Sequence, residues 1–527
     1  MDRRRLLQLA GAVSATACLP SRGQSQVRVG GASTPFAYGV ASGAPTHDGV
    51  VLWTRLSKEA VALRGGEAVE VRWELAHDQH FKRIVQHGYT SATPELGHSV
   101  HVEVQGLEPD RWYHYRFMFS DAVSATGRTR TFPLPGAIAK RLRLGYASCQ
   151  KWEDGYFTAW RHMAAENLDA VMFLGDYIYE YPGTSSKFRV PGGGWLATLD
   201  DYRARYALYK GDPDLQAMHA ACPWLVTWDD HEVQNDYAGV QPGDSGPPGF
   251  AAADFSMRRA AAYQAYYENM PLRASVLTQG LAGLARGAEM RIYSRVAFGR
   301  LASLYLLDGR QYRDAQACNR GDKQGSSMVD PARCGPWRDP GRSYLGLAQE
   351  GWLQGQFEGL AARSSVWNVL GQQTLFGQRN FGRNPAQRLW NDGWDGYSAA
   401  RRRLTDSLQT YEVRNPVIFG GDVHENWVGH VKADYANPDS ANVGVEFCGT
   451  SISSRSGKAS QSQEMLAANP HFVFVDGKSR GYGVADFTPG VLNVQLRVLG
   501  DVAQADSGVQ DLASFVVEAG SSLIKRA

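Results

Sequence analysis

The chain has 527 residues, of which 43% are hydrophobic, so it can bury a substantial interior but is too long for one compact core. Its formal net charge is +2, and no basic tract lies outside the N-terminus. This balance excludes an extended nucleic-acid-binding surface, and the 14 Trp and 24 Tyr residues exclude a disordered chain. We therefore expect two domains, one of them large.

Residues 1–25 are predicted to be a signal peptide, because a basic head precedes a short apolar run. Arg3-Arg4 resembles the twin-arginine type, whose export machinery would be a partner and whose destination is the periplasm or the cell exterior. Cys18 lacks the preceding aliphatic residue of a lipoprotein signal, which argues against a lipid anchor. Twin-arginine export moves folded proteins, so the leader also suggests a metal that is inserted before export.

Residues 31–135 are predicted to form a separate N-terminal domain similar to a fibronectin-type-III β-sandwich. Segments that alternate apolar and polar residues, at least in part, lie at 69–75, 98–104, 113–119 and 129–132. Tyr113 follows Leu107-Glu108-Pro109-Asp110, as in the tyrosine corner of such sandwiches. The domain carries no obvious chemistry, so we interpret it as a packing or substrate-edge module.

Residues 140–527 are predicted to form an α/β domain with sheets flanked by helices. Apolar segments that end abruptly on polar groups lie at 142–147, 170–174, 224–228, 301–307, 366–370 and 416–419. Short apolar runs are typical of strands covered on both faces, and open α/β sheets bind ligands at the carboxyl ends of their strands. We expect one sheet edge to hold all six exits.

Two adjacent metal half-sites are predicted from the groups at these exits. The first consists of Cys149, Asp176, Tyr179 and His424, and the second of Asp176 as a bridge, Asp230 and Asp422. Sulfur, imidazole and phenolate donors suit a transition metal such as iron, whereas clustered carboxylates suit calcium or magnesium. Two cations roughly 3.5–4 Å apart can activate water as hydroxide and neutralise a phosphoryl group. In the alternative interpretation Asp176 caps a loop and Cys149 is a packed thiol.

Two further residues are predicted to be catalytic. His231, beside Asp230, would face the substrate as an acid or a phosphate donor, and Arg310 would bind phosphate oxygens through its planar fork of donors. The alternatives are that His231 caps a turn and that Arg310 forms a structural ion pair with Asp308.

Five cysteines remain once the leader is excluded. Cys318 and Cys334 flank a polar loop, so a disulfide between them is plausible in an oxidising compartment. Cys222 and Cys448 are either buried thiols or a second pair.

Five ordered motifs together resemble the alkaline phosphatase D family, distant relatives of purple acid phosphatases among the metallophosphoesterases. They are Ser148-Cys149-Gln150, Gly175-Asp176-Tyr177-Ile178-Tyr179, Trp228-Asp229-Asp230-His231-Glu232-Val233, Asp308-Gly309-Arg310-Gln311-Tyr312-Arg313 and Gly420-Gly421-Asp422-Val423-His424. The resemblance implies a metallophosphoesterase-like α/β fold and a secreted phosphatase or phosphodiesterase with one Fe³⁺ and two Ca²⁺ ions. Its substrates would be phosphate monoesters or diesters. The alternatives are a phospholipase D-like phosphodiesterase acting on phospholipids and a non-catalytic extracytoplasmic binding protein.

Overall fold

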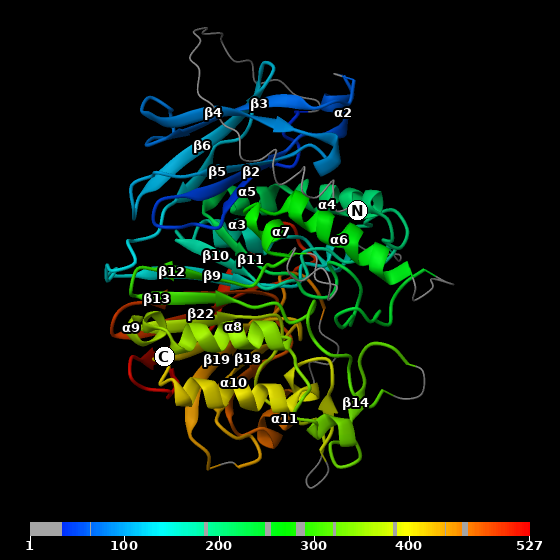
Figure 1. The fold of residues 1–527 in the computed structure, drawn as a ribbon, viewed down its shortest axis with the longest axis vertical. Helices are drawn as coiled ribbons and strands as arrows, with labels where there is room; N and C mark the ends of the chain where they lie inside the picture. Colours follow the sequence, from blue (N-terminus) through cyan, green and yellow to red (C-terminus); the bar gives the residue numbers. More distant parts are fainter. Residues whose placement is uncertain are drawn as a thin grey trace.

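The computed structural model describes residues 34–63, 65–183, 188–247, 254–280, 290–319, 323–382, 387–437, 439–455 and 462–527. The predicted leader, including Cys18, lies outside these residues. The main body consists of two sheets packed face to face, with helices on both outer faces, and a smaller β unit adjoins it at one end (Figure 1). Within the described part of the chain, no helix is both long and apolar enough to span a bilayer.

The first central sheet has ten strands in the order β24-β23-β22-β21-β9-β10-β11-β1-β2-β5. Their bounds are β1 (Val40–Gly43), β2 (Val50–Arg55), β5 (Ser99–Val104), β9 (Leu142–Ala147), β10 (Ala170–Phe173), β11 (Trp224–Val226), β21 (Gly481–Phe487), β22 (Val491–Leu499), β23 (Val509–Glu518) and β24 (Lys525–Arg526). The central strands β9, β10 and β11 run parallel and are almost entirely buried. This burial explains their continuous apolar character.

The second central sheet has seven strands in the order β12-β13-β15-β17-β19-β18-β20. Their bounds are β12 (Ser294–Phe298), β13 (Ala302–Leu306), β15 (Trp367–Gly371), β17 (Pro416–Gly420), β18 (Asn426–Lys432), β19 (Asn442–Cys448) and β20 (Phe472–Asp476). The predicted single sheet edge is therefore wrong, because three of the six exits belong to this second sheet. Apolar periodicity indicates a buried strand but not which of two facing sheets the strand joins.

The core between the sheets is apolar and well filled. Leu144 and Met172 of the first sheet belong to the same buried cluster as Leu304 and Val369 of the second. Helices α3 to α6 cover the outer face of the first sheet, and α8 and α10 cover that of the second (Figure 1). The helices are α3 (Thr158–Ala164), α4 (Leu199–Lys210), α5 (Pro213–Ala221), α6 (Phe255–Asn269), α7 (Ser275–Gly280), α8 (Leu347–Glu358), α9 (Leu360–Ser364), α10 (Ser398–Thr410) and α11 (Ser462–Ala468).

Helix α4 begins with a capping box between Thr198 and Asp201, which satisfies backbone donors that the first turn leaves free. The three tyrosines of α4, at positions 202, 206 and 209, are fully buried in the core beside the first sheet. Strands β12 and β13 pair antiparallel and form a hairpin around Gly299.

The N-terminal β unit contains β3 (Val69–Ala76), β4 (Ile84–Ala92), β6 (Trp112–Phe119), β7 (Ala122–Val123) and β8 (Gly127–Arg130), with α2 (Lys58–Ala62) beside it. The backbone N–H of Glu108 donates to the Tyr113 hydroxyl at 3.0 Å, which confirms the predicted tyrosine corner. Strands β1, β2 and β5 instead extend the ten-stranded sheet, so this unit is continuous with the main body.

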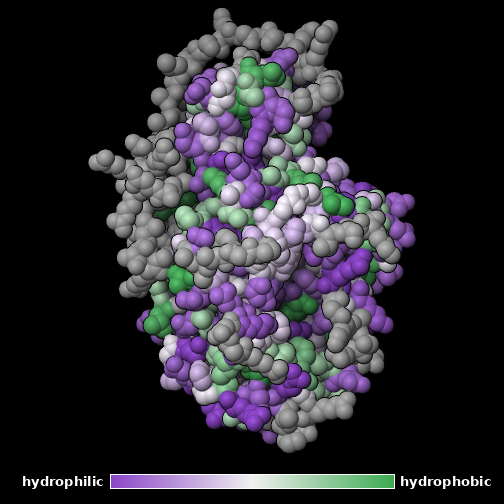
Figure 2. All heavy atoms as spheres, turned by 90° about the vertical axis from the view of Figure 1, so that its right-hand side faces the viewer, coloured by the Kyte–Doolittle hydropathy of each residue, from purple (hydrophilic) through white to green (hydrophobic). Residues whose placement is uncertain are grey.

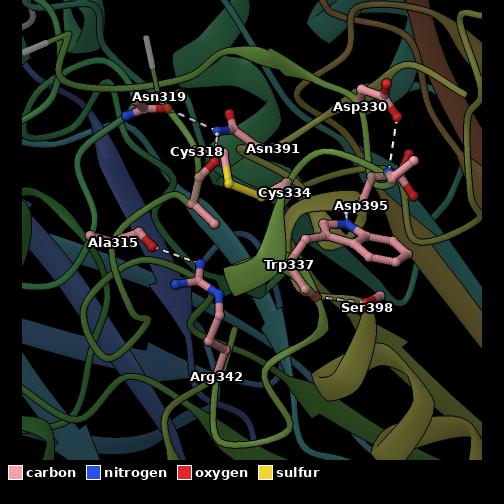
Figure 3. Close-up of a disulfide and its surroundings, with 12 residues drawn as sticks. Ala315, Cys318, Asn319, Asp330, Cys334, Trp337, Arg342, Asn391, Asp395 and Ser398 are labelled. Atoms are coloured by element: carbon pink, nitrogen blue, oxygen red, sulfur yellow. Dashed lines mark hydrogen bonds between the residues drawn. A yellow bond between two sulfur atoms is a disulfide. The ribbon is translucent and has the colours of Figure 1, made fainter. Parts of the chain in front are cut away.

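The disulfide predicted between Cys318 and Cys334 is present (Figure 3), whereas Cys222 and Cys448 are separate buried thiols. Near this disulfide, β14 (Met328–Val329) pairs with β16 (Leu389–Trp390). On the face shown in Figure 2, hydrophilic and hydrophobic residues are interspersed, as on an ordinary water-exposed surface.

Candidate metal centre

The site lies where the carboxyl ends of strands from both sheets meet. Cys149 follows β9, Asp176 follows β10, and Asp230 follows β11 of the first sheet, whereas Asp422 follows β17 of the second. The two sets of loops touch: a Cβ placed on Gly421 would lie 2.2 Å from Oγ of Ser148. Only glycine permits this approach, which brings the exits of the two sheets together.

Backbone conformation sets four of the six predicted ligands apart. Cys149, Asp176, Asp422 and His424 all have positive φ angles, between 56° and 63°. Non-glycine residues rarely adopt this left-handed conformation, and such residues cluster at functional sites where the surrounding structure holds them. Glu232 provides part of that support, because its carboxylate accepts the backbone N–H groups of Asp176, Tyr177 and Asp229 at 2.6–3.1 Å.

The first predicted half-site is assembled. Ligand atoms of Cys149, Asp176 and His424 all lie within 4.8 Å of one another. The Tyr179 hydroxyl donates to Asp176 Oδ2 at 2.9 Å and lies 3.3 Å from Nε2 of His424. The His424 Nδ1–H donates to the carbonyl of Arg455 at 2.9 Å, which leaves Nε2 directed at the tyrosine and available as a ligand.

The electrostatics of this half-site favour a bound cation. Burial, reinforced by nearby carboxylates, raises the pKa of Cys149, Asp176 and Tyr179 well above their ordinary values. Burial also lowers the pKa of His424 to about 4, so that its imidazole is neutral at pH 7. Oδ1 of Asp176 is buried and has no hydrogen-bond partner within the described residues. A cation among these donors would supply the charge and the coordination that protein neighbours do not.

The second half-site is more acidic. Carboxylate oxygens of Asp176 and Asp230 lie within 4.8 Å of each other and of a ring nitrogen of His231. Asp422 falls outside this group, although it lies at the neighbouring exit and accepts a 2.6 Å hydrogen bond from Thr374 Oγ1. Burial, together with the negative charges of Asp230 and Asp392, raises the pKa of Asp422 to about 6. These oxygen donors suit a hard cation.

His231 is held by a residue that was not predicted. Its Nδ1 lies 2.7 Å from Oε2 of buried Glu180, and its ring packs against Tyr179 with ring centres 4.2 Å apart. Burial alone would lower the pKa of His231, but the charges of Glu180, Asp176 and Asp230 outweigh it and raise that pKa well above its usual value. The contact with Glu180 orients the imidazole and leaves the second ring nitrogen, Nε2, free of Glu180.

Arg310 lies deep among the carboxylates of the site. Its guanidinium is fully buried, pairs with Asp229, and lies 2.8 Å from Asp392 and 3.5 Å from Asp230. Asp308 accepts the backbone N–H of Arg310 at 3.0 Å, so the predicted Asp308 pair is a backbone contact. The predicted phosphate contact of Arg310 stays a prediction, and the geometry favours a role in positioning carboxylates.

A third acidic group combines Asp230, Asp236 and Asp392. Arg310 and Arg313 both pair with Asp392, so the protein itself offsets part of the negative charge of this group. Sequence reasoning missed Asp392 because it follows no buried strand exit.

Lys151 is a partly exposed cation beside the site. The Lys151 side chain is 26% exposed, and its nearest carboxylate oxygen, in Glu153, is 3.5 Å from Nζ. Nζ lies 5.8 Å and 5.3 Å from the ring centres of Tyr179 and Tyr181. Its position two residues after Cys149 was the available sequence signal.

Residues 144–496 match the model of the PhoD-like phosphatase family, and residues 23–133 match that of the N-terminal domain of PhoD-like phosphatases. The chain belongs to the PhoD-like phosphatase family. Alkaline phosphatase D of Bacillus subtilis (strain 168) is 42% identical to this PhoD-like phosphatase over 535 residues, covering 98% of this chain and 88% of the relative. A solved structure of PhoD has a TM-score of 0.86 and 40% identity, covering 95% of this chain and 93% of the other.

The family membership confirms the resemblance and the fold class inferred from the motifs. This PhoD-like phosphatase is a phosphoester hydrolase of a metal-dependent family, which rules out the alternative of a non-catalytic binding protein. The donor set fits that dependence, because ligand atoms from distant segments converge around a buried carboxylate oxygen that has no partner in the described chain.

Proposed function

We propose that this phosphatase hydrolyses phosphate monoesters or diesters with one Fe³⁺ and two Ca²⁺ ions. Cys149, Asp176, Tyr179 and His424 would hold the iron, and Asp176, Asp230 and Asp422 would hold calcium. The observation that carries the proposal is the convergence of Cys149, Asp176 and His424 within 4.8 Å, with the Tyr179 phenol 2.9 Å from Asp176. Sulfur and phenolate donors favour iron, and carboxylates favour calcium.

The chemistry that bound ions supply is the activation of water as hydroxide and the neutralisation of phosphoryl charge during in-line displacement. His231, oriented and kept charged by Glu180, would donate a proton to the leaving oxygen or a hydrogen bond to the phosphoryl group. Lys151 would meet the substrate phosphate from the solvent side, since its ammonium is partly exposed beside the tyrosines. Arg310 would act indirectly, by orienting the carboxylates of Asp229 and Asp230.

Elemental analysis of Cys149→Ala tests the iron assignment. We expect iron per chain and phosphatase activity to fall together, while calcium is retained. Cys222→Ala is the matched control, because Cys222 is also a buried thiol but belongs to none of the clustered donor groups of the described chain. Unchanged iron in Cys149→Ala would refute the ligand assignment.

The substrate class requires a separate comparison. A monoester, a diester and a phosphatidyl lipid should be assayed side by side on the metal-loaded enzyme. Preference for the lipid would favour the phospholipase D-like alternative, whereas turnover of soluble esters supports the proposal.

We also propose that the protein is exported through the twin-arginine route to the periplasm or the exterior. The Cys318–Cys334 disulfide supports this, because structural disulfides persist mainly in oxidising compartments. Replacing Arg3 and Arg4 by lysine should leave the protein in the cytoplasmic fraction. Unimpaired export of that variant would contradict the proposed route.

A further inference from the structure

The described part of the loop between Cys318 and Cys334, residues 319 and 323–333, contacts the group of acidic residues beside the metal centre. The disulfide closes the loop with a Cα–Cα distance of 5.9 Å (Figure 3). Cys318 is exposed, whereas Cys334 is buried. The loop contains no predicted metal ligand. It contacts Asp236, which belongs to the group of Asp230, Asp236 and Asp392, and Asn391, which directly precedes Asp392.

The first contact is through Ser326. Both its backbone N–H, at 3.1 Å, and its hydroxyl donate to Oδ2 of Asp236. The backbone N–H of Asp236 donates in turn to Oδ2 of Asp230 at 2.7 Å. A single residue therefore separates the loop from a proposed calcium ligand.

The second contact is through Asn391. Its side-chain oxygen accepts the backbone N–H of Ser327 at 2.5 Å, and its amide donates to the Ala317 carbonyl at 2.8 Å. The same amide donates to Asn319 at 2.9 Å (Figure 3). Asn391 is followed directly by Asp392, which accepts hydrogen bonds from Arg310 at 2.8 Å and Gln316 at 2.7 Å.

These contacts counteract the electrostatic repulsion among three buried carboxylates. Oxygens of Asp230, Asp236 and Asp392 lie within 4.8 Å of one another, and like charges so close repel strongly in a buried environment. Arg310 and Arg313 offset part of this repulsion, and the two loop contacts fix where Asp236 and Asp392 come to rest.

We propose that the loop closed by Cys318 and Cys334 is a positioning element for the metal centre. It holds Asp230 through Ser326–Asp236 and, less directly, through Asn391–Asp392 and the Arg310 guanidinium between Asp392 and Asp230. The proposal rests on the proposed function, because it takes Asp230 as a metal ligand. Breaking the disulfide leaves the sheets intact but lets the loop move, so cation affinity and turnover both fall.

The reductive step is chemically simple. A thiolate of a dithiol such as dithiothreitol attacks Sγ of exposed Cys318, and Cys334 leaves as a thiolate. The second thiol of the reagent then displaces Cys318, so the reagent becomes a cyclic disulfide and two cysteine thiols form.

The test compares Ser326→Ala, Ser327→Ala and the double variant Cys318→Ser/Cys334→Ser in the full chain. Ser327 is the matched control, because the contacts of Ser327 on this route use only its backbone. We expect Ser326→Ala and the double variant to lose about 10-fold in turnover and in calcium affinity. Exchange of the Asp236 amide hydrogen should accelerate in both, whereas Ser327→Ala and Ser326→Thr should resemble the wild type.

Two results would overturn the positioning role. One is a folded Ser326→Ala protein with wild-type calcium affinity and Asp236 exchange. The other is full activity of the wild type after dithiothreitol treatment that is shown to have reduced the disulfide. The double variant, which lacks the disulfide, is treated in parallel to reveal direct effects of the reagent. Asp230→Asn distinguishes the failure of this proposal from the failure of the proposed function. If Asp230→Asn keeps calcium and activity, the ligand assignment is wrong. If Asp230→Asn is inactive but Ser326→Ala behaves like the wild type, the positioning role of the loop is wrong.

Discussion

The Tyr179 hydroxyl donates to Oδ2 of Asp176 at 2.9 Å, while Oδ1 of the same carboxylate is buried without a hydrogen-bond partner in the described residues. The two side chains come from one loop, after β10, and leave one carboxylate oxygen free for a cation. A phenol and a free carboxylate oxygen side by side would suit the proposed pair of unlike metal ions, because phenolate favours iron and carboxylate favours calcium.

Tyr179→Phe removes the phenol oxygen and keeps the ring. We expect iron affinity to fall about 10-fold or more, and the visible absorption of a ferric phenolate to disappear. Tyr177→Phe is the matched control, because Tyr177 is equally buried but its hydroxyl lies 2.9 Å from His219. A coloured, iron-replete Tyr179→Phe protein would show that the phenol is not a ligand.

His231→Asn removes the charged proton donor. If His231 acts on the substrate, kcat should fall by about 10²- to 10⁴-fold while metal content stays at the wild-type level. Glu180→Gln should give a smaller loss, because it weakens the 2.7 Å contact that orients the imidazole but leaves the ring in place. Loss of a metal ion from His231→Asn would instead identify His231 as a ligand.

Arg310→Ala separates a structural role from a substrate contact. The substitution leaves Asp229, Asp230 and Asp392 buried without their shared cation, so we expect a loss of about 3–5 kcal/mol in the free energy of unfolding. Arg402→Ala, which breaks an exposed pair with Asp406, should cost at most about 1 kcal/mol. An unchanged stability with a raised KM would restore the phosphate contact predicted from the sequence.

Lys151→Ala should weaken substrate binding without lowering stability, the reverse of Arg310→Ala. Its partly exposed ammonium stabilises little of the fold, so Tm should stay near the wild-type value while KM for a phosphate ester rises by about 10-fold. Lys82→Ala, on an exposed loop of the N-terminal β unit, should change neither quantity. Wild-type KM in Lys151→Ala would exclude Lys151 from substrate binding.

The sequence predicted the strands and their polar exits because each depends on local signals. Short apolar runs and abrupt Gly-Asp endings located β10 and β17 and the residues that follow them. The division of the exits between two sheets was not predicted, because it depends on contacts between residues far apart in the chain. Met172 of β10 packs so closely on Gly371 of β15 that a Cβ on Gly371 would lie 2.3 Å from the methionine sulfur.

The supporting residues of the site were harder to predict than its donors. Glu180, Thr374 and Asp392 act through hydrogen bonds to residues far away in the chain, and none stands in a spacing that indicates a site. Arg310 shows what residue type alone does not reveal. Its motif placed it among the predicted site residues, but only the structure shows that its guanidinium is buried among carboxylates.

The junction between β5 and helix α6 should lose stability in acid through His101. Nε2 of His101 lies 3.0 Å from the carbonyl oxygens of Tyr267 and Met270, and its ring stacks on Tyr267. Burial lowers the pKa of His101 to about 4; the nearby charge of Glu103 opposes this shift and that of Lys210 adds to it. The neutral form is therefore favoured in the folded state, and the unfolded chain binds more protons between about pH 6.5 and pH 4.

This contribution is fully present above about pH 6.5 and is lost as the pH falls towards 4. Between about pH 7.5 and pH 5 the expected loss is about 2 kcal/mol. His101→Gln keeps a hydrogen-bond donor without the titration, so its unfolding free energy should fall less over this range than that of the wild type. His87→Gln, at an exposed position of β4, should follow the wild type. Parallel pH dependence in the wild type and His101→Gln, measured by denaturant unfolding, would show that His101 does not destabilise this junction in acid.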